Sequence, residues 1–176
     1  MTYGWDCAGN DQGVVRVGIA DFLLAVSLVV DEAGAFKVIG TNEVDGEYLR
    51  KAAIQGYDHN GRIYPTFNGG QLLVRELYPD RGIWDVGASR GRDEGCQLVV
   101  CATLYGTPWS MFAGRVQYNG VFDTDFGEEG VQVIDTEHSV WISADVMTLH
   151  ANGDILMGHH GHIYWLLGND SAQVQG

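Results

Sequence analysis

The stretch that decides the fold runs from Arg115 to Gly130 and reads RVQYNGVFDTDFGEEG. Its segment GVFDTDFG, which starts at Gly120, has an upstream counterpart GRIYPTFN that starts at Gly61. An Asn-Gly pair opens both segments, and this pair is the strongest short signal for a turn between two β-strands. We therefore predict a β-rich unit that repeats with a period of about 60 residues.

Three further markers keep the same period. A turn glycine before a compact apolar strand occurs at Gly34, Gly95 and Gly153, each separated from the next by nearly one period. Aromatic residues flank these glycines at nearly constant distances on both sides. The series before them is Phe22, Trp84 and Trp141, and the series after them is Tyr48, Trp109 and Trp165. The sequence thus predicts one domain with three copies, over about residues 5–62, 63–121 and 122–176.

Glycine turns divide each copy into short apolar stretches that we expect to be four strands. In the second copy these are Gln71 to Leu77, Gly82 to Ser89, Cys96 to Leu104 and Trp109 to Tyr118. In the third they are Val131 to Ile134, Trp141 to His150, Asp154 to Gly158 and His162 to Leu167. Helices over Ile19 to Val30 and Tyr48 to Gln55 are the alternatives, but consistency among repeats outweighs local propensity.

The repeated segments carry a family resemblance. The segment from Arg115 to Gly130, together with LHANGDIL from Leu149, resembles the delta-60 repeat family. The first segment has, in the order of that family's pattern, an arginine, an aromatic-Asn pair, Gly, Asp-Thr and Phe-Gly. The upstream copy departs from this pattern, because Gly56 stands where the arginine is expected and Tyr64-Pro65 where Asp-Thr is expected. The resemblance implies a propeller-like β fold and no established catalytic residues.

Four strands per unit also suit a β-propeller blade, but three blades do not close a ring. Propellers contain about four to eight blades, so three copies leave two unprotected faces. We expect an all-β chain of three four-stranded propeller-like repeats that completes a six-bladed ring by two-fold dimerisation. The alternatives are a compact fold that covers its own ends and a fragment of a longer array.

Composition limits the classes of partner. The chain of 176 residues has 10 basic and 23 acidic residues, a net charge of −13, which argues against nucleic acid as a ligand. The longest apolar stretch is far shorter than the ~20 residues of a membrane helix, so we expect no membrane partner. No secretory signal is visible and the three cysteines lack metal-type spacing. These features predict a cytoplasmic protein, although a mature secreted chain would look the same.

Histidines form one candidate metal site. His159, His160 and His162 follow each other closely and His150 precedes them, while His160 and His162 would share one face of a strand. With Asp154 nearby, this cluster could hold zinc and serve a metal-assisted hydrolase or lyase. No HExxH arrangement is present, and an exposed hairpin turn explains the same residues, so we favour the hairpin.

The acidic turn at Asp123 and Asp125 is a second candidate. Oxygen-rich glycine turns suit calcium, but the spacing of an EF-hand loop is missing. We favour the interpretation that Asp123 caps the turn through its own backbone. We therefore expect no resident cofactor, with zinc or calcium as the alternatives.

No nucleophile elbow, phosphate loop or dinucleotide motif appears in the sequence. We therefore predict a non-enzymatic recognition module that stacks a carbohydrate ring or docks a protein through aromatic side chains. The candidates are Trp84, Trp109, Trp141 and Trp165. Alternatives are core packing of these rings, the metal-assisted enzyme, and a structural or inhibitory subunit for a basic partner protein.

Overall fold

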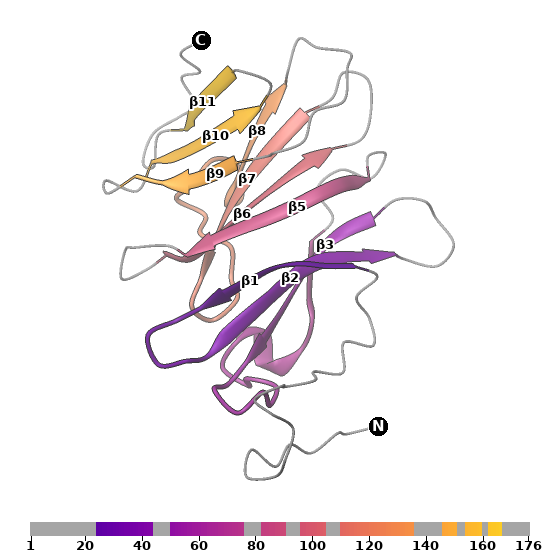
Figure 1. Ribbon diagram of the computed structural model, residues 1–176, viewed down its shortest axis with the longest axis vertical. Coiled ribbons are helices and arrows are strands. Elements are labelled where there is room, and N and C mark those ends of the chain that lie inside the picture. The colour runs from indigo at the N-terminus through magenta and orange to yellow at the C-terminus, as the bar shows by residue number, and fades with distance from the viewer. Residues whose placement is uncertain are drawn as a thin grey trace.

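The computed structural model describes residues 24–43, 50–75, 82–90, 96–104, 110–135, 146–150, 154–159 and 162–166. These residues form three antiparallel β-sheets that follow one another along the long axis of the molecule (Figure 1). The predicted all-β class is confirmed. Both helical alternatives are wrong, because strands occupy 24–30 and 50–57, where apolar side chains alternate between two faces.

The first sheet has the strand order β1-β2-β3-β4. Its strands are β1 (Leu24–Val30), β2 (Phe36–Glu43), β3 (Arg50–Tyr57) and β4 (Leu73–Arg75). A short 3₁₀ turn, η1 (Asn68–Gly70), precedes β4. Gly34, with a φ of +80°, makes the hairpin turn between β1 and β2 at the position that the turn glycine predicts.

The second sheet repeats this order as β5-β6-β7-β8. Its strands are β5 (Ile83–Arg90), β6 (Cys96–Leu104), β7 (Ser110–Gln117) and β8 (Val131–Asp135). The predicted strands for the second copy agree with β5, β6 and β7 to within a single position at each end. Cys101 is buried in β6 and packs in the core.

The third sheet differs from the prediction, because its described part has three strands instead of four. They are β9 (Val146–Leu149), β10 (Ile155–His159) and β11 (His162–Leu166), in the order β11-β10-β9. The stretch Val131 to Ile134 was expected as the first strand of this unit, but it forms β8, which pairs with β7 of the second sheet. The sheets therefore span 24–75, 83–135 and 146–166, out of phase with the predicted copies.

The second sheet is the centre of the stack and buries apolar side chains on both faces. One face packs Leu98, Val100 and Phe112 against the first sheet. The opposite face packs Val99, Cys101 and Ala113 against the third sheet. The first strands of the sheets also meet in succession, since β1 contacts β5 and β5 contacts β9. The described sheets form no closed barrel or ring.

The connection between the third and fourth strands is the same in the first two sheets. The Tyr64 amide donates to the Gly56 carbonyl in one, and the Asp123 amide donates to the Arg115 carbonyl in the other. Isolated bridges follow the same rule, joining Tyr57 to Ile63 and Val116 to Phe122. All equivalent pairs share one offset, so the backbone of these two connections repeats with the spacing of the matching segments in the sequence. None of the described residues forms a helix long and apolar enough to cross a bilayer.

The second connection depends on glycine at Gly127, where the first connection has Asn68. The φ of Gly127 is +58°, and a Cβ atom there would collide with the Val131 carbonyl oxygen. Gly69 has a similar φ of +62°, but a Cβ atom on it would meet only open space. We expect Gly69→Ala to lower the free energy of unfolding by about 1 kcal/mol through backbone strain alone. Gly127→Ala should lower it by about 3 kcal/mol, because a steric clash adds to the same strain.

Urea unfolding of the two variants measures this difference. Because both glycines have nearly the same φ, Gly69→Ala is the matched control for Gly127→Ala. Equal losses in the two variants would show that the clash with Val131 does not exist in solution.

Candidate functional site

The third sheet presents one face to the second sheet and the other to the outside. Ile155, Met157 and Leu166 belong to the core shared with the second sheet. Because side chains alternate along a strand, Leu156 and the residues paired with it lie on the opposite face. We call this the outer face of the third sheet; it comprises Thr148, Leu156, Ile163 and Trp165.

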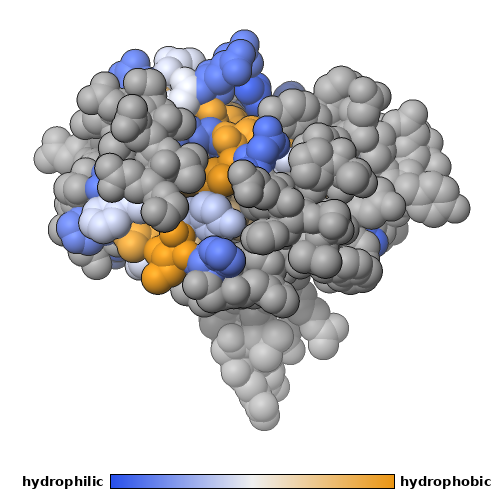
Figure 2. All heavy atoms as spheres, turned by 90° about the horizontal axis from the view of Figure 1, so that it is seen from above, coloured by the Kyte–Doolittle hydropathy of each residue, from blue (hydrophilic) through white to orange (hydrophobic). Residues whose placement is uncertain are grey.

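Large apolar side chains are exposed on this outer face. Ile163 is 70% exposed and Trp165 is 45% exposed. Figure 2 looks onto the end of the molecule where the third sheet lies and shows apolar residues at the surface among polar ones. Exposed aromatic and aliphatic groups side by side on a rigid sheet are typical of a surface that contacts a partner.

A buried carboxylate fixes the Trp165 ring. Trp165 Nε1 donates a hydrogen bond of 2.7 Å to Asp154 Oδ2, and Asp154 is only 6% exposed. The Asp154 backbone carbonyl accepts a hydrogen bond of 2.8 Å from the His150 amide. The His150 ring lies 5.9 Å from the Trp165 ring, centre to centre. Trp165 therefore has a defined orientation before any partner binds, which lowers the entropy lost on binding.

The other tryptophan candidates remain predictions. The backbone of Trp84 lies in β5, but its side chain is outside the described residues. Trp109 and Trp141 also lie outside the described residues. Trp165 is the candidate whose position the structure gives, and it lies at the surface and not in the core.

The histidine cluster is described in part. His162 is exposed on β11 and pairs in register with His159 at the end of β10, as a hairpin requires. The His162 ring lies 6.5 Å from the Tyr164 ring. His160 lies outside the described residues, while His150 is placed beside Trp165. Across the described ranges, no three His, Cys, Asp or Glu side chains form a group that could hold a metal ion. The zinc alternative stays a prediction.

The acidic turn has a structural role, as the capping interpretation predicts. Asp123 Oδ1 accepts a hydrogen bond of 3.3 Å from the Asp125 amide. Asp123 Oδ2 also forms a 2.6 Å ion pair with Arg115, whose guanidinium lies 5.4 Å from the centre of the Phe126 ring. Both side chains of the ion pair are 12% exposed, whereas Asp125 is exposed. Arg115 thus supplies beside Asp123 the positive charge that a calcium ion would bring.

The departures from the repeat pattern in the first sheet have a physical reason. Gly56 takes the place of Arg115, and the Phe67 ring fills the space beside it, since a Cβ on Gly56 would lie 2.8 Å from Phe67 Cβ. Tyr64 takes the place of Asp123 and makes a different contact. The first connection is therefore closed by an aromatic ring and the second by an ion pair.

Tyr64 forms a polar cluster that the sequence analysis missed. Its hydroxyl is 2.5 Å from the hydroxyl of Tyr118 on the turn after β7. Lys37 Nζ lies 5.2 Å from the centre of the Tyr118 ring and pairs with Asp31 Oδ2 at 3.2 Å. These four residues come from β2, two connections and a hairpin turn, so no local spacing could have signalled them.

The two tyrosines of this cluster titrate differently. Hydrogen bonds from Thr66 and Tyr118 lower the pKa of Tyr64. The hydrogen bond with Tyr64 raises the pKa of Tyr118 to about 12, and burial adds to this effect. Of the two hydroxyls, Tyr64 therefore loses its proton first as the pH rises, and either hydroxyl can donate the hydrogen bond while both are protonated. The cluster joins the first and second sheets, because the Asn68 amide also donates to the Asn119 carbonyl at 2.7 Å.

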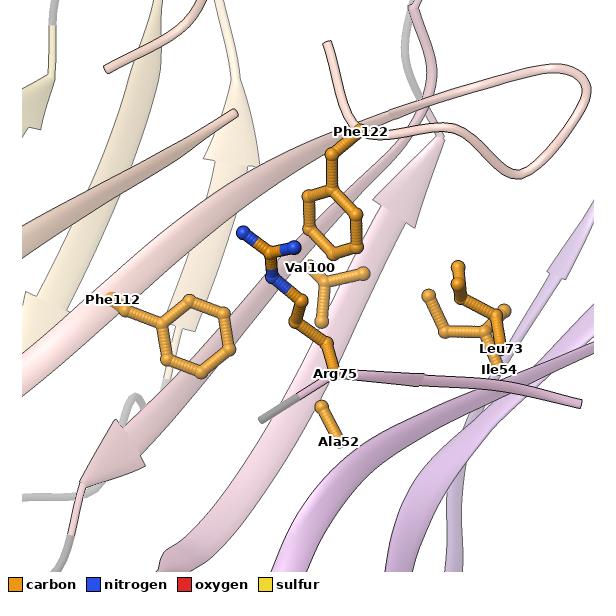
Figure 3. Close-up of a pocket in the computed structure, with 7 residues that line it drawn as sticks. All are labelled: Ala52, Ile54, Leu73, Arg75, Val100, Phe112 and Phe122. Atoms are coloured by element: carbon orange, nitrogen blue, oxygen red, sulfur yellow. The ribbon is translucent and has the colours of Figure 1, made fainter. Parts of the chain in front are cut away.

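A small crevice lies between the first two sheets. Figure 3 shows the Arg75 guanidinium between the rings of Phe112 and Phe122, and its distance from the centre of the Phe122 ring is 5.0 Å. The cavity volume of the crevice is about 10 Å³, roughly the space of one water molecule and far below the ~300 Å³ at which ligand pockets begin. Arg75 also pairs with the exposed carboxylate of Glu129 at 3.1 Å. Arg75 fills this gap between sheets, and the crevice leaves little room for a ligand.

No family model, curated protein or solved structure matches the chain.

The ion pair in the acidic turn predicts an asymmetry between its two aspartates. Asp123→Asn removes the charge that faces Arg115, so we expect a loss of about 2 kcal/mol in the free energy of unfolding. Asp125→Asn changes an exposed side chain and serves as the matched control, with an expected change below about 0.5 kcal/mol. Urea unfolding in the presence and absence of calcium measures both. Calcium-dependent stability lost in both variants would favour the metal site instead.

The tyrosine pair predicts a separate pH effect. Tyr64→Phe removes the hydrogen-bond partner of Tyr118, so the pKa of Tyr118 should fall from about 12 toward the ordinary value of about 10. NMR titration with tyrosine labelled at Cζ measures this shift. In the reciprocal variant Tyr118→Phe, the pKa of Tyr64 should rise because a donor is lost. An unchanged Tyr118 pKa in Tyr64→Phe would mean that the hydroxyls are not paired in solution.

Proposed function

We propose that this chain is a non-enzymatic recognition module of propeller type, which binds a partner protein through the outer face of its third sheet. The observation that carries this proposal is the exposed Trp165, held in one orientation by the buried Asp154. Tryptophan is among the side chains that most often dominate binding energy when fixed in a well-packed interface. Ile163 adjoins it on the same face and extends the apolar contact.

A propeller-type arrangement accounts for the shape of the stack. Each sheet resembles a blade whose first strand contacts the first strand of the next, in the order β1, β5 and β9. The repeated connection between the third and fourth strands supports the delta-60 resemblance in the first two sheets. A partner that supplies a further sheet would extend the same packing, and a six-bladed ring of two chains is the proposed complete form.

An apolar protein surface suits the outer face better than a sugar does. A sugar site needs several polar groups around the aromatic ring, whereas Ile163 and Leu156 offer none. Asp154 is buried behind Trp165 and already accepts its indole proton. The net charge of −13 favours an external partner whose binding surface is basic.

Fluorescently labelled chain applied to arrays of purified proteins and glycans tests the proposal, with the chain itself included among the proteins. We expect Trp165→Ala and Ile163→Asp to weaken protein signals by about 30-fold, the effect of losing about 2 kcal/mol at an interface centre. Val121→Asp is the control, because Val121 is 54% exposed but lies on the second connection.

Circular dichroism verifies that each variant folds. Binding to glycans alone would assign the face to carbohydrate and overturn the choice of protein. Protein signals that all three variants retain would show that the outer face is not the binding surface.

A further inference from the structure

The outer face of the third sheet has a counterpart at the other end of the stack. We call the face of a sheet that looks toward the next sheet along the chain its forward face, and the opposite face its backward face. Within the molecule, each contact between sheets joins the forward face of one sheet to the backward face of the next. The forward face of the first sheet carries Ile39 and Ile54, and the backward face of the second carries Val100 and Phe112. The forward face of the second carries Val99 and Ala113, and the backward face of the third carries Ile155 and Met157.

The repeat offset shows that these faces are equivalent. Ile54 and Ala113 are separated by the same offset as the connections that follow β3 and β7, and both lie on forward faces. By the same logic, the outer face of the third sheet is a forward face with no fourth sheet in front of it among the described residues. Its exposed Ile163 and Trp165 occupy a surface type that is buried in the other two sheets.

The first sheet exposes a backward face. Only one end of this face is exposed: Leu28 and Val30 alternate with the core residue Val29, so they point away from the second sheet, and Leu28 is 58% exposed. Val38 and Ala53, which lie on the same face nearer its centre, are buried in the single chain. Ile63 is the equivalent of Phe122, which packs on the core between the first two sheets. Ile63 is 57% exposed, because no preceding sheet is present among the described residues.

We infer that the partner of the outer face is the first sheet of a second copy of this chain. The third sheet of each copy packs its Ile163 and Trp165 against the Leu28, Val30 and Ile63 surface of the other. This inference rests on the proposed function and names its partner. Two such contacts close a ring of six sheets, within the range of about four to eight in which propellers close, whereas a single head-to-tail contact would leave one end of each type exposed.

Charge gives the association a distinctive salt dependence. Each copy carries a net charge of −13, so two copies repel each other while their apolar faces attract. Salt screens this repulsion, and self-association should strengthen as ionic strength rises. Binding to a basic external protein should weaken under the same change. The direction of the salt effect thus separates the two kinds of partner.

Sedimentation velocity over a range of protein and salt concentrations tests the inference. We expect a species of twice the 19.2 kDa chain mass for the unmodified protein and for the control Val121→Asp. Ile163→Asp and Ile63→Asp, one on each face, should both sediment as a single chain. Both positions are largely exposed in the single chain, so circular dichroism should show that the variants stay folded.

Mixing the two monomeric variants distinguishes head-to-tail from symmetric contact. Ile163→Asp keeps an intact first sheet and Ile63→Asp keeps an intact third sheet, so the mixture should recover a two-chain species through one intact contact. Dissociation by Ile163→Asp alone, with Ile63→Asp still dimeric, would show that two third sheets pair with each other and would overturn the inference. A single-chain mass for the unmodified protein at all concentrations would overturn it as well.

The array experiment keeps the two proposals separate. A monomeric chain that binds another protein through Trp165 retains the proposed function and rejects the second copy as partner. A two-chain species that Ile163→Asp leaves intact rejects the second copy as the partner of the outer face, and the array alone then decides the proposed function.

Discussion

The central sheet has apolar side chains on both of its faces, and the need to bury both determines the order of the molecule. Leu98, Val100 and Phe112 require a sheet on one side, and Val99, Cys101 and Ala113 require one on the other. A sheet with two apolar faces cannot lie at a surface, so the first and third sheets are placed as its two covers. The third sheet then has one face in the core and leaves Ile163 and Trp165 exposed on the other.

The first two sheets of the stack share one type of connection between their third and fourth strands. The turn between the third and fourth strands has the same backbone hydrogen bonds at Gly56 and Tyr64 as at Arg115 and Asp123. The side chains at these four positions differ, since Phe67 fills the space beside Gly56 in one turn and Arg115 pairs with Asp123 in the other. The backbone geometry is therefore the repeated element, and the side chains at these positions are two solutions for filling the same space.

Much of the architecture could be predicted from residues close together in sequence. Turn glycines and alternating apolar residues placed the strand Cys96–Leu104 correctly and β7 to within a single position at each end. The third sheet was harder, because Val131–Asp135 looks like a first strand in sequence but pairs back onto β7. Strand pairing is a long-range choice that local pattern does not specify. The capping role of Asp123 was foreseen, whereas its ion pair with Arg115 was not.

The sequence by itself determined the all-β class, the repeat offset and the turn positions, because glycine at positive φ and apolar alternation act over short stretches of chain. Only the tertiary structure decided which faces are buried and which are exposed. It placed Trp165 at the surface beside Asp154 and joined Tyr64 to Tyr118 across two sheets. These contacts depend on how the sheets pack against one another, and residues 11 or 54 positions apart carry no local signal that they will meet.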